Sequence, residues 1–239
     1  MMVDWVSGQR PYILGHRGAS VDAPENTVAA FVLALDQGAD GIELDVQLSQ
    51  DGVLVIYHDM RLHPETGCDE RIADMTLAEL KALDMGEGQE IPTLDEVFEA
   101  LGPAALYNVE IKDWRLWDGG TETAVADRIQ SHNLERQCHI SSFNPFSVRR
   151  ARRHLTRSTS SGILRQPGIL RFSYLFTHSE ADHPQHSMID ETYMAWARKR
   201  GYQVHTWTVD DPAEAQRLAK LGVDGIITNK PALIREAVR

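Results

Sequence analysis

Residues 41–48 read Gly-Ile-Glu-Leu-Asp-Val-Gln-Leu, an apolar, strand-like run that carries two acidic residues. Side chains two positions apart on a strand point the same way, so Glu43 and Asp45 share one face of this predicted strand. Isolated carboxylates that point into a protein interior are costly to bury without a partner. The run therefore indicates a buried strand that carries an acidic site, together with a partner that neutralises it.

Strand-like and helix-like runs alternate on both sides of this segment, which favours a parallel α/β sheet. The length of 239 residues is close to the ~250 residues typical of a (β/α)₈ barrel. We therefore predict an α/β fold, a (β/α)₈ TIM barrel, as a single domain over residues 1–239. The predicted strands are Tyr12–Gly15, Gly41–Leu48, Leu106–Ile111, Gln137–Ser142, Ser160–Leu164, a weak run near Ala181, Tyr202–Thr208 and Gly225–Thr228.

Capping sequences mark the starts of the predicted helices. Asp211-Pro212-Ala213-Glu214 combines an acid suited to the N-cap, a proline at the first helical position and a glutamate that can reach back. Thr76 and Thr93 each stand three residues before a glutamate, a spacing typical of a capping box. The predicted helices cover Asn26–Gln37, Leu94–Leu101, Thr123–His132, Pro145–His154, Ile189–Arg200, Pro212–Leu221 and Pro231–Val238.

Between residues 59 and 92 the alternation of strands and helices breaks down. The segment His63-Pro64-Glu65-Thr66-Gly67 is typical of a turn, and one short helix is predicted near Leu77–Leu83. We interpret this interval as a small insertion subdomain after the second strand, in a position to cover the site.

Composition disfavours several classes of protein. Hydrophobic residues make up 42% of the chain and charged residues 25%, which suits a globular protein with a sizeable core. The formal net charge of −11 disfavours nucleic acid and anionic membranes as partners. Apolar runs of membrane-span or signal-peptide length are lacking, so we expect a cytoplasmic protein without a membrane anchor. Cys68 and Cys138 are expected to be ordinary thiols.

Polar side chains share one position in the predicted fold, near the carboxyl ends of the strands. In a (β/α)₈ barrel these ends converge on one face, where active sites are built. Residues far apart in the sequence are therefore expected to share one pocket. They are His16, Arg17, Glu43, Asp45, Glu110, Lys112, Ser141, Ser142, His183 and Trp207.

Glu43, Asp45 and Glu110 offer three carboxylates and no cysteine, a set that suits a hard ion, Mg²⁺ or Ca²⁺, rather than zinc. A divalent cation would remove the cost of burying these acids. The alternative is that the acids form buried ion pairs with Arg17 and Lys112. Spacing alone leaves both interpretations open, and we favour the metal site.

His16 and His58 each lie at a predicted strand end beside acidic residues. A single histidine is more often structural, but imidazole titrates near neutral pH, so a pair suits a general acid and a general base. Arg17 offers a planar fork that suits a phosphate. Phosphoryl transfer needs such positive groups at the nonbridging oxygens of the phosphate, so Arg17 and the two histidines together favour phosphoryl transfer.

A series of motifs runs through nearly the whole chain. They are Gly15-His16-Arg17-Gly18-Ala19, Pro24-Glu25-Asn26-Thr27, Gly41-Ile42-Glu43-Leu44-Asp45-Val46, Asp51-Gly52-Val53-Leu54-Val55-Ile56-Tyr57-His58-Asp59, Ile91-Pro92-Thr93-Leu94, Asn108-Val109-Glu110-Ile111-Lys112, Ser141-Ser142-Phe143, Trp207-Thr208-Val209 and Gly222-Val223-Asp224-Gly225-Ile226-Ile227-Thr228. In this order they resemble the glycerophosphodiester phosphodiesterase family. The His-Arg-Gly, Glu-x-Asp and His-Asp segments are the most specific of these matches.

The resemblance implies a barrel with a small insertion that hydrolyses a small-molecule glycerophosphodiester to glycerol 3-phosphate and an alcohol. It implies that His16 and His58 form the catalytic acid/base pair and that a divalent cation binds at the three acids. By motif position it further implies Arg17 and Lys112 as phosphate ligands, Trp207 on the glycerol side, Asn26 as a hydrogen-bonding support, and His183, or His186 in its place, in the pocket.

Two segments depart from the family pattern. His63-Pro64-Glu65-Thr66 stands where an Arg-Thr-Thr-type segment is often found, and Thr228-Asn229-Lys230-Pro231 stands where an aspartate is often found. Both are expected to lie outside the catalytic set. Trp114 and Trp117 follow the third predicted strand in an unusual loop, and we expect them to pack against the barrel rim, with an apolar entrance for a lipid chain as the alternative.

Several alternatives remain open. A lysophospholipase D, with the same catalytic site and a more apolar entrance, is the main alternative function. A metal-dependent barrel lyase or aldolase and an inactive phosphate-ester binding protein are less favoured. The sequence leaves open the preferred alcohol, Mg²⁺ against Ca²⁺, which histidine is the acid, whether water or the substrate 2-hydroxyl attacks, and the oligomeric state.

Overall fold

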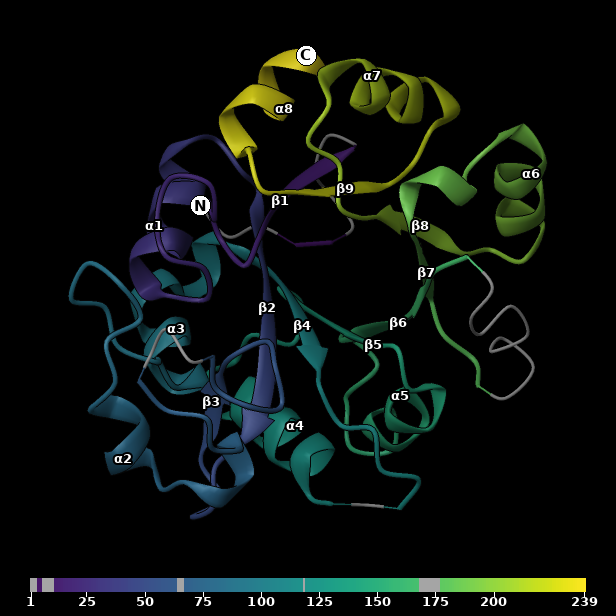
Figure 1. Cartoon of the computed structure of the whole chain (residues 1–239). Helices are drawn as coiled ribbons and strands as arrows, with labels where there is room; N and C mark the ends of the chain where they lie inside the picture. The colour runs from purple at the N-terminus through teal and green to yellow at the C-terminus, as the bar shows by residue number, and fades with distance from the viewer. Residues whose placement is uncertain (1–3, 6–10, 64–66, 118, 168–176) are drawn as a thin grey trace.

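A closed ring of eight parallel strands forms the centre of the computed structural model, which describes residues 4–5, 11–63, 67–117, 119–167 and 177–239 (Figure 1). The strands are β1 (Tyr12–His16), β2 (Gly41–Leu48), β4 (Leu106–Ile111), β5 (Cys138–Ser142), β6 (Ser160–Arg165), β7 (Ala181–Pro184), β8 (Gln203–Thr206) and β9 (Gly225–Thr228). Because β1 pairs in parallel with both β2 and β9, the ring closes. The predicted TIM barrel is confirmed, including the weak strand near Ala181.

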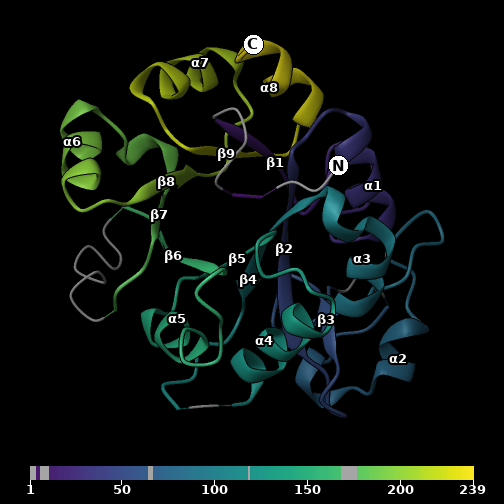
Figure 2. The same ribbon diagram turned by 180° about the vertical axis from the view of Figure 1, so that it is seen from behind.

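Helices surround this ring on its outer side (Figures 1 and 2). Predicted capping signals are present: Thr93 and Glu96 form a capping box, and Asp211 accepts hydrogen bonds at the start of its helix. One helix begins at Thr121 rather than at Thr123, after Gly120 with a φ of 88°. The helices are α1 (Val28–Asp36), α3 (Leu94–Leu101), α4 (Thr121–Ser131), α5 (Pro145–Ala151), α6 (Glu191–Lys199), α7 (Pro212–Leu221) and α8 (Pro231–Ala237).

An apolar layer between the strands and the helices holds the barrel together. Phe31 of α1 and Leu44 of β2 are fully buried members of this layer. Strands β2 and β4 approach closely at Gly41, where a Cβ atom would lie 2.1 Å from the carbonyl oxygen of Leu106. A glycine at this position therefore permits the pairing of β2 with β4, the two strands that carry the predicted acidic site.

The insertion between β2 and α3 begins with β3 (Leu54–Ile56). Because β3 pairs with β2 in the antiparallel direction, it lies beside the barrel and does not enter the ring. The alternation of strands and helices therefore breaks at β3, before residue 59, where the insertion was predicted to begin. The insertion continues with a 3₁₀ helix (Ile72–Asp74) and α2 (Leu77–Lys81), and residues 64–66 of its predicted turn lie outside the described residues. Its own apolar cluster consists of Val55, Tyr57, Leu62, Ile72, Leu80 and Ile91.

The state of the two cysteines and the character of the described helices bear on two expectations from the sequence. Cys68 and Cys138 are both free thiols, as expected. Among the described helices, none combines the length and apolar character that a membrane crossing requires.

Candidate active site

Three carboxylates meet where the carboxyl end of β4 lies beside the middle of β2. Asp45 lies opposite Glu110 in the parallel register, and Glu43 lies two residues before Asp45 on the same face of β2. One carboxylate oxygen from each side chain lies within 4.8 Å of the other two. All three residues are buried, so their negative charges are held together away from water.

Two cationic side chains border this acidic cluster. Lys112 Nζ lies 2.8 Å from Glu110 Oε1 and 3.4 Å from Asp45 Oδ1. Arg17 Nε lies 3.4 Å from Asp45 Oδ2, and the backbone N–H of Arg17 donates to Glu43 Oε2 at 3.1 Å. The buried ion pairs that the sequence left open as an alternative to a metal site are therefore present in the structure. However, two cations face three carboxylates, so the pairs do not balance the charge of the cluster.

Burial and mutual repulsion oppose full ionisation of the acidic cluster. Burial, followed by the charges of Asp45 and Glu110, raises the pKa of Glu43 well above its ordinary value. Burial likewise raises the pKa of Glu110 to about 7. Burial would also raise the pKa of Asp45, but Lys112 and Arg17 outweigh it and lower that pKa. The cluster therefore holds protons near neutral pH, and a bound cation would displace them.

This donor set fits a hard divalent cation. Asp45 Oδ1 is buried and accepts no hydrogen bond from the described part of the chain, although Lys112 Nζ lies 3.4 Å away. Carboxylate oxygens are the ligands that Mg²⁺ and Ca²⁺ prefer, and a divalent charge would offset the excess of acids over bases. Glu43, Asp45 and Glu110 are therefore able to bind a metal ion.

His16, the last residue of β1, is held by hydrogen bonds from the other end of the chain. Its Nδ1 lies 2.7 Å from Asn229 Oδ1, and the Asn229 side-chain amide donates to Asp210 Oδ2 at 2.6 Å. Because Asp210 orients the amide, Asn229 Oδ1 accepts from Nδ1–H, and His16 Nε2 keeps the lone pair. His16 Nε2 lies 3.9 Å from Glu43 Oε2. Burial, followed by the Arg17 charge, lowers the pKa of His16, so its ring is neutral at pH 7.

His58 follows β3 and belongs to the insertion. Its Nδ1 lies 2.7 Å from Asp59 Oδ1, and Asp59 Oδ2 lies 2.7 Å from His63 Nε2. Burial lowers the pKa of His58, and the nearby carboxylates of Asp45 and Asp59 oppose this fall. His58 lines a cavity together with His16, Glu43 and Glu110, and Asp59 and Met60 line an adjoining cavity, so the insertion contributes to the wall of the site.

The turn after β1 contains two residues with a left-handed backbone. Arg17 has a φ of 55° and Asn26 a φ of 57°, a conformation that costs roughly 1–2 kcal/mol for a residue with a side chain. The Asn26 N–H donates to Arg17 O at 3.0 Å, and Asn26 Nδ2 donates to Asp45 Oδ2 at 2.9 Å. Arg17 Nη1 donates to Glu25 Oε1 at 2.9 Å. These bonds tie the strained turn to the acidic cluster.

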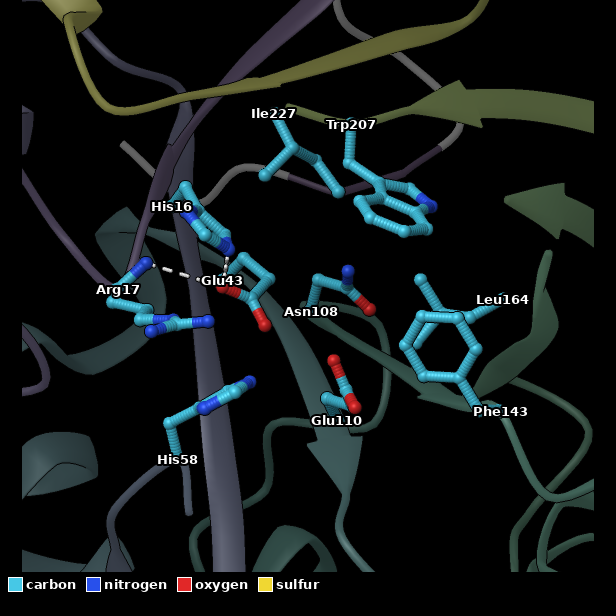
Figure 3. Close-up of a pocket in the computed structure, with 10 residues that line it drawn as sticks. All are labelled: His16, Arg17, Glu43, His58, Asn108, Glu110, Phe143, Leu164, Trp207 and Ile227. Atoms are coloured by element: carbon cyan, nitrogen blue, oxygen red, sulfur yellow. Dashed lines mark hydrogen bonds and ion pairs between the residues drawn. The ribbon is translucent and has the colours of Figure 1, made fainter. Parts of the chain in front are cut away.

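A cavity of about 60 Å³ opens between these polar groups and an apolar wall (Figure 3). The rings of Phe143 and Trp207 form part of that wall and meet edge to face, with centroids 5.4 Å apart. Trp207 is held in place because its Nε1 donates to the backbone oxygen of His183 at 2.9 Å. The cavity is lined by His16, Arg17, Glu43, His58, Asn108, Glu110, Phe143, Leu164, Trp207 and Ile227.

A second cavity of about 420 Å³ adjoins the first and shares His58, Phe143 and Trp207 with it. Trp114 also lines this cavity, and its ring stacks over Phe143 with centroids 6.2 Å apart. The expectation that Trp114 and Trp117 pack only against the barrel rim is wrong, because their exposed fractions are 58% and 69%. Trp114 thus adds an apolar surface beside the mouth of the site, and Trp117 lines a further cavity together with Trp114.

Ser141 and Ser142 were also expected in the pocket, but they line neither cavity. His183 is likewise not brought to the other candidates. It is fully buried inside the barrel, where its ring stacks on His139 and contacts His205 edge to face. The alternative residue, His186, lies in a 3₁₀ helix (His186–Met188), and its Nδ1 lies 2.9 Å from Glu214 Oε1. Neither histidine lines the two cavities described above.

The sequence interpretation missed several residues of the site. Asn229, which was expected to lie outside the catalytic set, has its side chain in contact with His16. Glu25 was not singled out as the partner of Arg17, nor Asn108 and Phe143 as lining residues. The position of Asn229 directly after the last barrel strand was a usable signal, since that end of the strand faces the site.

Comparisons with known proteins match almost the whole chain. The model of the "Glycerophosphoryl diester phosphodiesterase family" matches residues 16–233. A glycerophosphodiester phosphodiesterase of Caldanaerobacter subterraneus subsp. tengcongensis is 39% identical over 95% of this chain and 97% of its own. An Oleispira antarctica phosphodiesterase, solved with the product sn-glycerol-3-phosphate, has a TM-score of 0.83 and 31% identity, covering 95% and 96% of the two chains. A glycerophosphodiester phosphodiesterase of Agrobacterium tumefaciens has a TM-score of 0.79 and 29% identity, covering 94% and 99%.

The raised pKa values predict that cation binding is linked to proton release. Because the pKa of Glu110 is about 7 in the metal-free protein, a cation must displace a proton below that pH, and affinity should fall by about tenfold per pH unit. Calorimetric titration with Mg²⁺ and Ca²⁺ from pH 6 to 8, in buffers of different ionisation enthalpy, measures both effects. A binding constant that does not change over this range would contradict the prediction.

Proposed function

Since the chain belongs to the glycerophosphoryl diester phosphodiesterase family, we propose that it hydrolyses glycerophosphodiesters to sn-glycerol 3-phosphate and an alcohol by metal-dependent histidine catalysis. Its enzyme class, glycerophosphodiester phosphodiesterase, follows from relatives that match it nearly end to end. The observation that carries the mechanism is a single cavity lined by His16, His58 and two carboxylates of the acidic cluster, Glu43 and Glu110. The cytoplasmic location and the lack of nucleic acid partners stay predictions.

Positive charge for the phosphate comes from groups around the acidic cluster. A divalent cation bound by Glu43, Asp45 and Glu110 would supply Lewis-acid charge to the nonbridging oxygens. Arg17 presents its guanidinium beside the same cluster and suits a phosphate oxygen. Burial lowers the pKa of Lys112, but Glu110 and Asp45 outweigh burial and raise it, so Lys112 stays protonated.

His16 is the better candidate for the general base. Its Nε2 carries the lone pair, because Nδ1–H is donated to Asn229, and its lowered pKa keeps the ring neutral at pH 7. A neutral ring with a fixed tautomer can accept a proton at Nε2 from the attacking group, whether that group is water or the substrate 2-hydroxyl. The link to Asp210 through Asn229 stabilises this orientation.

His58 is then the general acid that protonates the leaving alcohol. Asp59 accepts from its Nδ1–H and opposes the lowering of the His58 pKa by burial, and in the protonated ring Nε2–H faces the cavity. Asn26 supports the arrangement through Asp45, and the Trp207 ring offers an apolar surface for the glycerol carbons. His183, which lies outside both cavities, has no role in this proposal.

Removal of either histidine should reduce turnover and leave the fold intact. We expect His16→Ala and His58→Ala each to lower kcat by roughly 10²–10⁴, the usual contribution of a general acid or base. The assay is glycerol 3-phosphate release from a panel of glycerophosphodiesters, and His154→Ala, an exposed histidine, is the matched control. Turnover at the wild-type level in the double variant His16→Ala/His58→Ala would rule the mechanism out.

Asn229→Asp tests the assignment of His16 as the base. A carboxylate in place of the Asn229 amide would favour the charged imidazole and raise the pKa of His16, by about one unit. Since the base must be neutral, the acid limb of the kcat/KM pH profile should move to higher pH by that amount. If the acid limb does not move while the variant stays active, His16 is not the base.

A second substrate class, lysophospholipids, is favoured by one observation. The cavity of about 420 Å³ that adjoins the catalytic cavity is lined by Met60, Trp114, Phe143 and Trp207, and Trp114 is 58% exposed. An alkyl chain that leaves the site along this wall would cover the apolar surface. The catalytic groups would be the same as for a water-soluble diester.

Substitution of the two tryptophans separates these substrate classes. Trp114→Ala/Trp117→Ala should lower kcat/KM for lysophosphatidylcholine by roughly tenfold, because the apolar contact to the chain is lost. The same variant should hydrolyse glycerophosphocholine at the wild-type rate. Equal effects on both substrates, measured by choline release, would exclude a role for these residues in chain binding.

A further inference from the structure

A second cluster of potential metal ligands lies inside the barrel, apart from the acidic cluster. His139 of β5, His183 of β7 and His205 of β8 are fully buried. One ring nitrogen from each lies within 4.8 Å of the other two, and the Nε2 atoms of His139 and His183 are 2.9 Å apart. Three side chains from three strands thus converge on one point in the barrel.

Two features of the surrounding chain make room for this cluster and close it. At Gly162 of β6, a Cβ atom would lie 2.5 Å from a ring carbon of His183 and 2.8 Å from His139 Nε2, so any larger residue would displace the rings. Trp5 stacks on His205 with centroids 5.0 Å apart and contacts Tyr12, the first residue of β1. In the sheet register His139 pairs with Ser160, the first residue of β6, and His205 pairs with Gly225, the first residue of β9. The cluster therefore lies level with the amino ends of β6 and β9, under a tryptophan, although His183 and His205 are the third of four residues in β7 and β8.

The position of the cluster separates it from the catalytic cavity. Active sites of TIM barrels lie at the carboxyl ends of the strands, whereas groups near the amino ends serve stability. The link between the two regions is indirect: Trp207, which lines the catalytic cavity, donates to the backbone oxygen of His183. None of the three ring side chains lines that cavity.

One hydrogen bond of the cluster, made by His139, resembles those around histidine ligands. His139 Nδ1 lies 2.6 Å from Ser160 Oγ, and this contact orients the ring so that Nε2 faces His183. A metal-ligating histidine typically makes such a bond with its second nitrogen. The Nδ1 atom of His183 is buried and has no hydrogen-bond partner among the described residues.

We propose that His139, His183 and His205 bind a first-row transition metal, with Zn²⁺ as the expected ion, in a structural site near the amino end of the barrel. Neutral imidazole nitrogen is a ligand for Zn²⁺ and is a poor one for Mg²⁺ or Ca²⁺. A tetrahedral zinc site needs ligand nitrogens roughly 3.3 Å apart, so His139 and His183 would separate slightly. The fourth position would hold water, and the ion would join β5, β7 and β8.

The test measures metal content in protein made with a tag free of histidine. The chain is produced in medium supplemented with zinc or with cobalt, purified without chelator, and assayed by elemental analysis and by the visible spectrum of the cobalt form. Glu43→Gln/Asp45→Asn removes carboxylate ligands of the acidic cluster. His183→Gln and His205→Gln remove ligands of the proposed site, and His154→Gln is an exposed-histidine control.

The proposal predicts about one zinc or cobalt ion per chain in the wild type, the control and the carboxylate variant, and less than a tenth of that in the His183→Gln and His205→Gln variants. The cobalt form should show the intense visible bands of a tetrahedral, nitrogen-ligated ion. If a histidine variant does not fold, the wild type and the carboxylate variant alone decide, through metal content and the cobalt spectrum. Folded wild type without a stoichiometric transition metal, or loss of the metal in the carboxylate variant, would overturn the proposal.

Discussion

The repulsion among three carboxylates buried in one place is the constraint on which the site depends. Glu43, Asp45 and Glu110 hold oxygens within 4.8 Å of one another and away from water. Such an arrangement is costly unless cations and hydrogen-bond donors compensate it. Lys112, Arg17 and Asn26 each contact the cluster, yet the pKa values of Glu43 and Glu110 stay raised. Compensation within the described chain is therefore partial, and a divalent cation would complete it.

This constraint also explains the shape of the turn after β1. Arg17 and Asn26 both adopt a positive φ, which is unfavourable for residues with side chains. In return, the Arg17 N–H donates to Glu43, and Asn26 donates to Asp45. Backbone strain is thus offset by donors directed at buried acids, a combination that is common where a site must be held rigid. Barrel closure through β1 and β9 adds Asn229 behind His16.

The sequence predicted the fold and the acidic cluster because both follow from local patterns. Alternation of strand and helix signals defines a barrel, and a two-residue spacing places Glu43 and Asp45 on one face whatever the rest of the chain does. The distance of a residue from the barrel mouth does not follow from such local patterns. His183 and Trp207 were both expected in the pocket, but only Trp207 lies there. The alternation of side chains along a strand determines which face a residue lies on, but not how far the residue lies from the barrel mouth.

Contacts between distant segments were the other limit of the sequence. Asn229 meets His16 because the last strand pairs with the first. Its position after that strand indicates the face on which it lies, but not which side chain it contacts. Exposure of Trp114 and Trp117 likewise depends on what neighbouring loops leave uncovered. The tendency of large aromatic residues to be buried therefore predicted the wrong environment for both.

The central claim is that turnover requires a divalent cation at the three carboxylates. Its most direct test is glycerol 3-phosphate release from glycerophosphocholine by protein treated with EDTA, before and after Mg²⁺ or Ca²⁺ is added back. The account predicts that EDTA abolishes release and that one of these ions restores it along a saturable curve. Full turnover in EDTA, by folded protein shown by elemental analysis to contain no divalent metal, would contradict it.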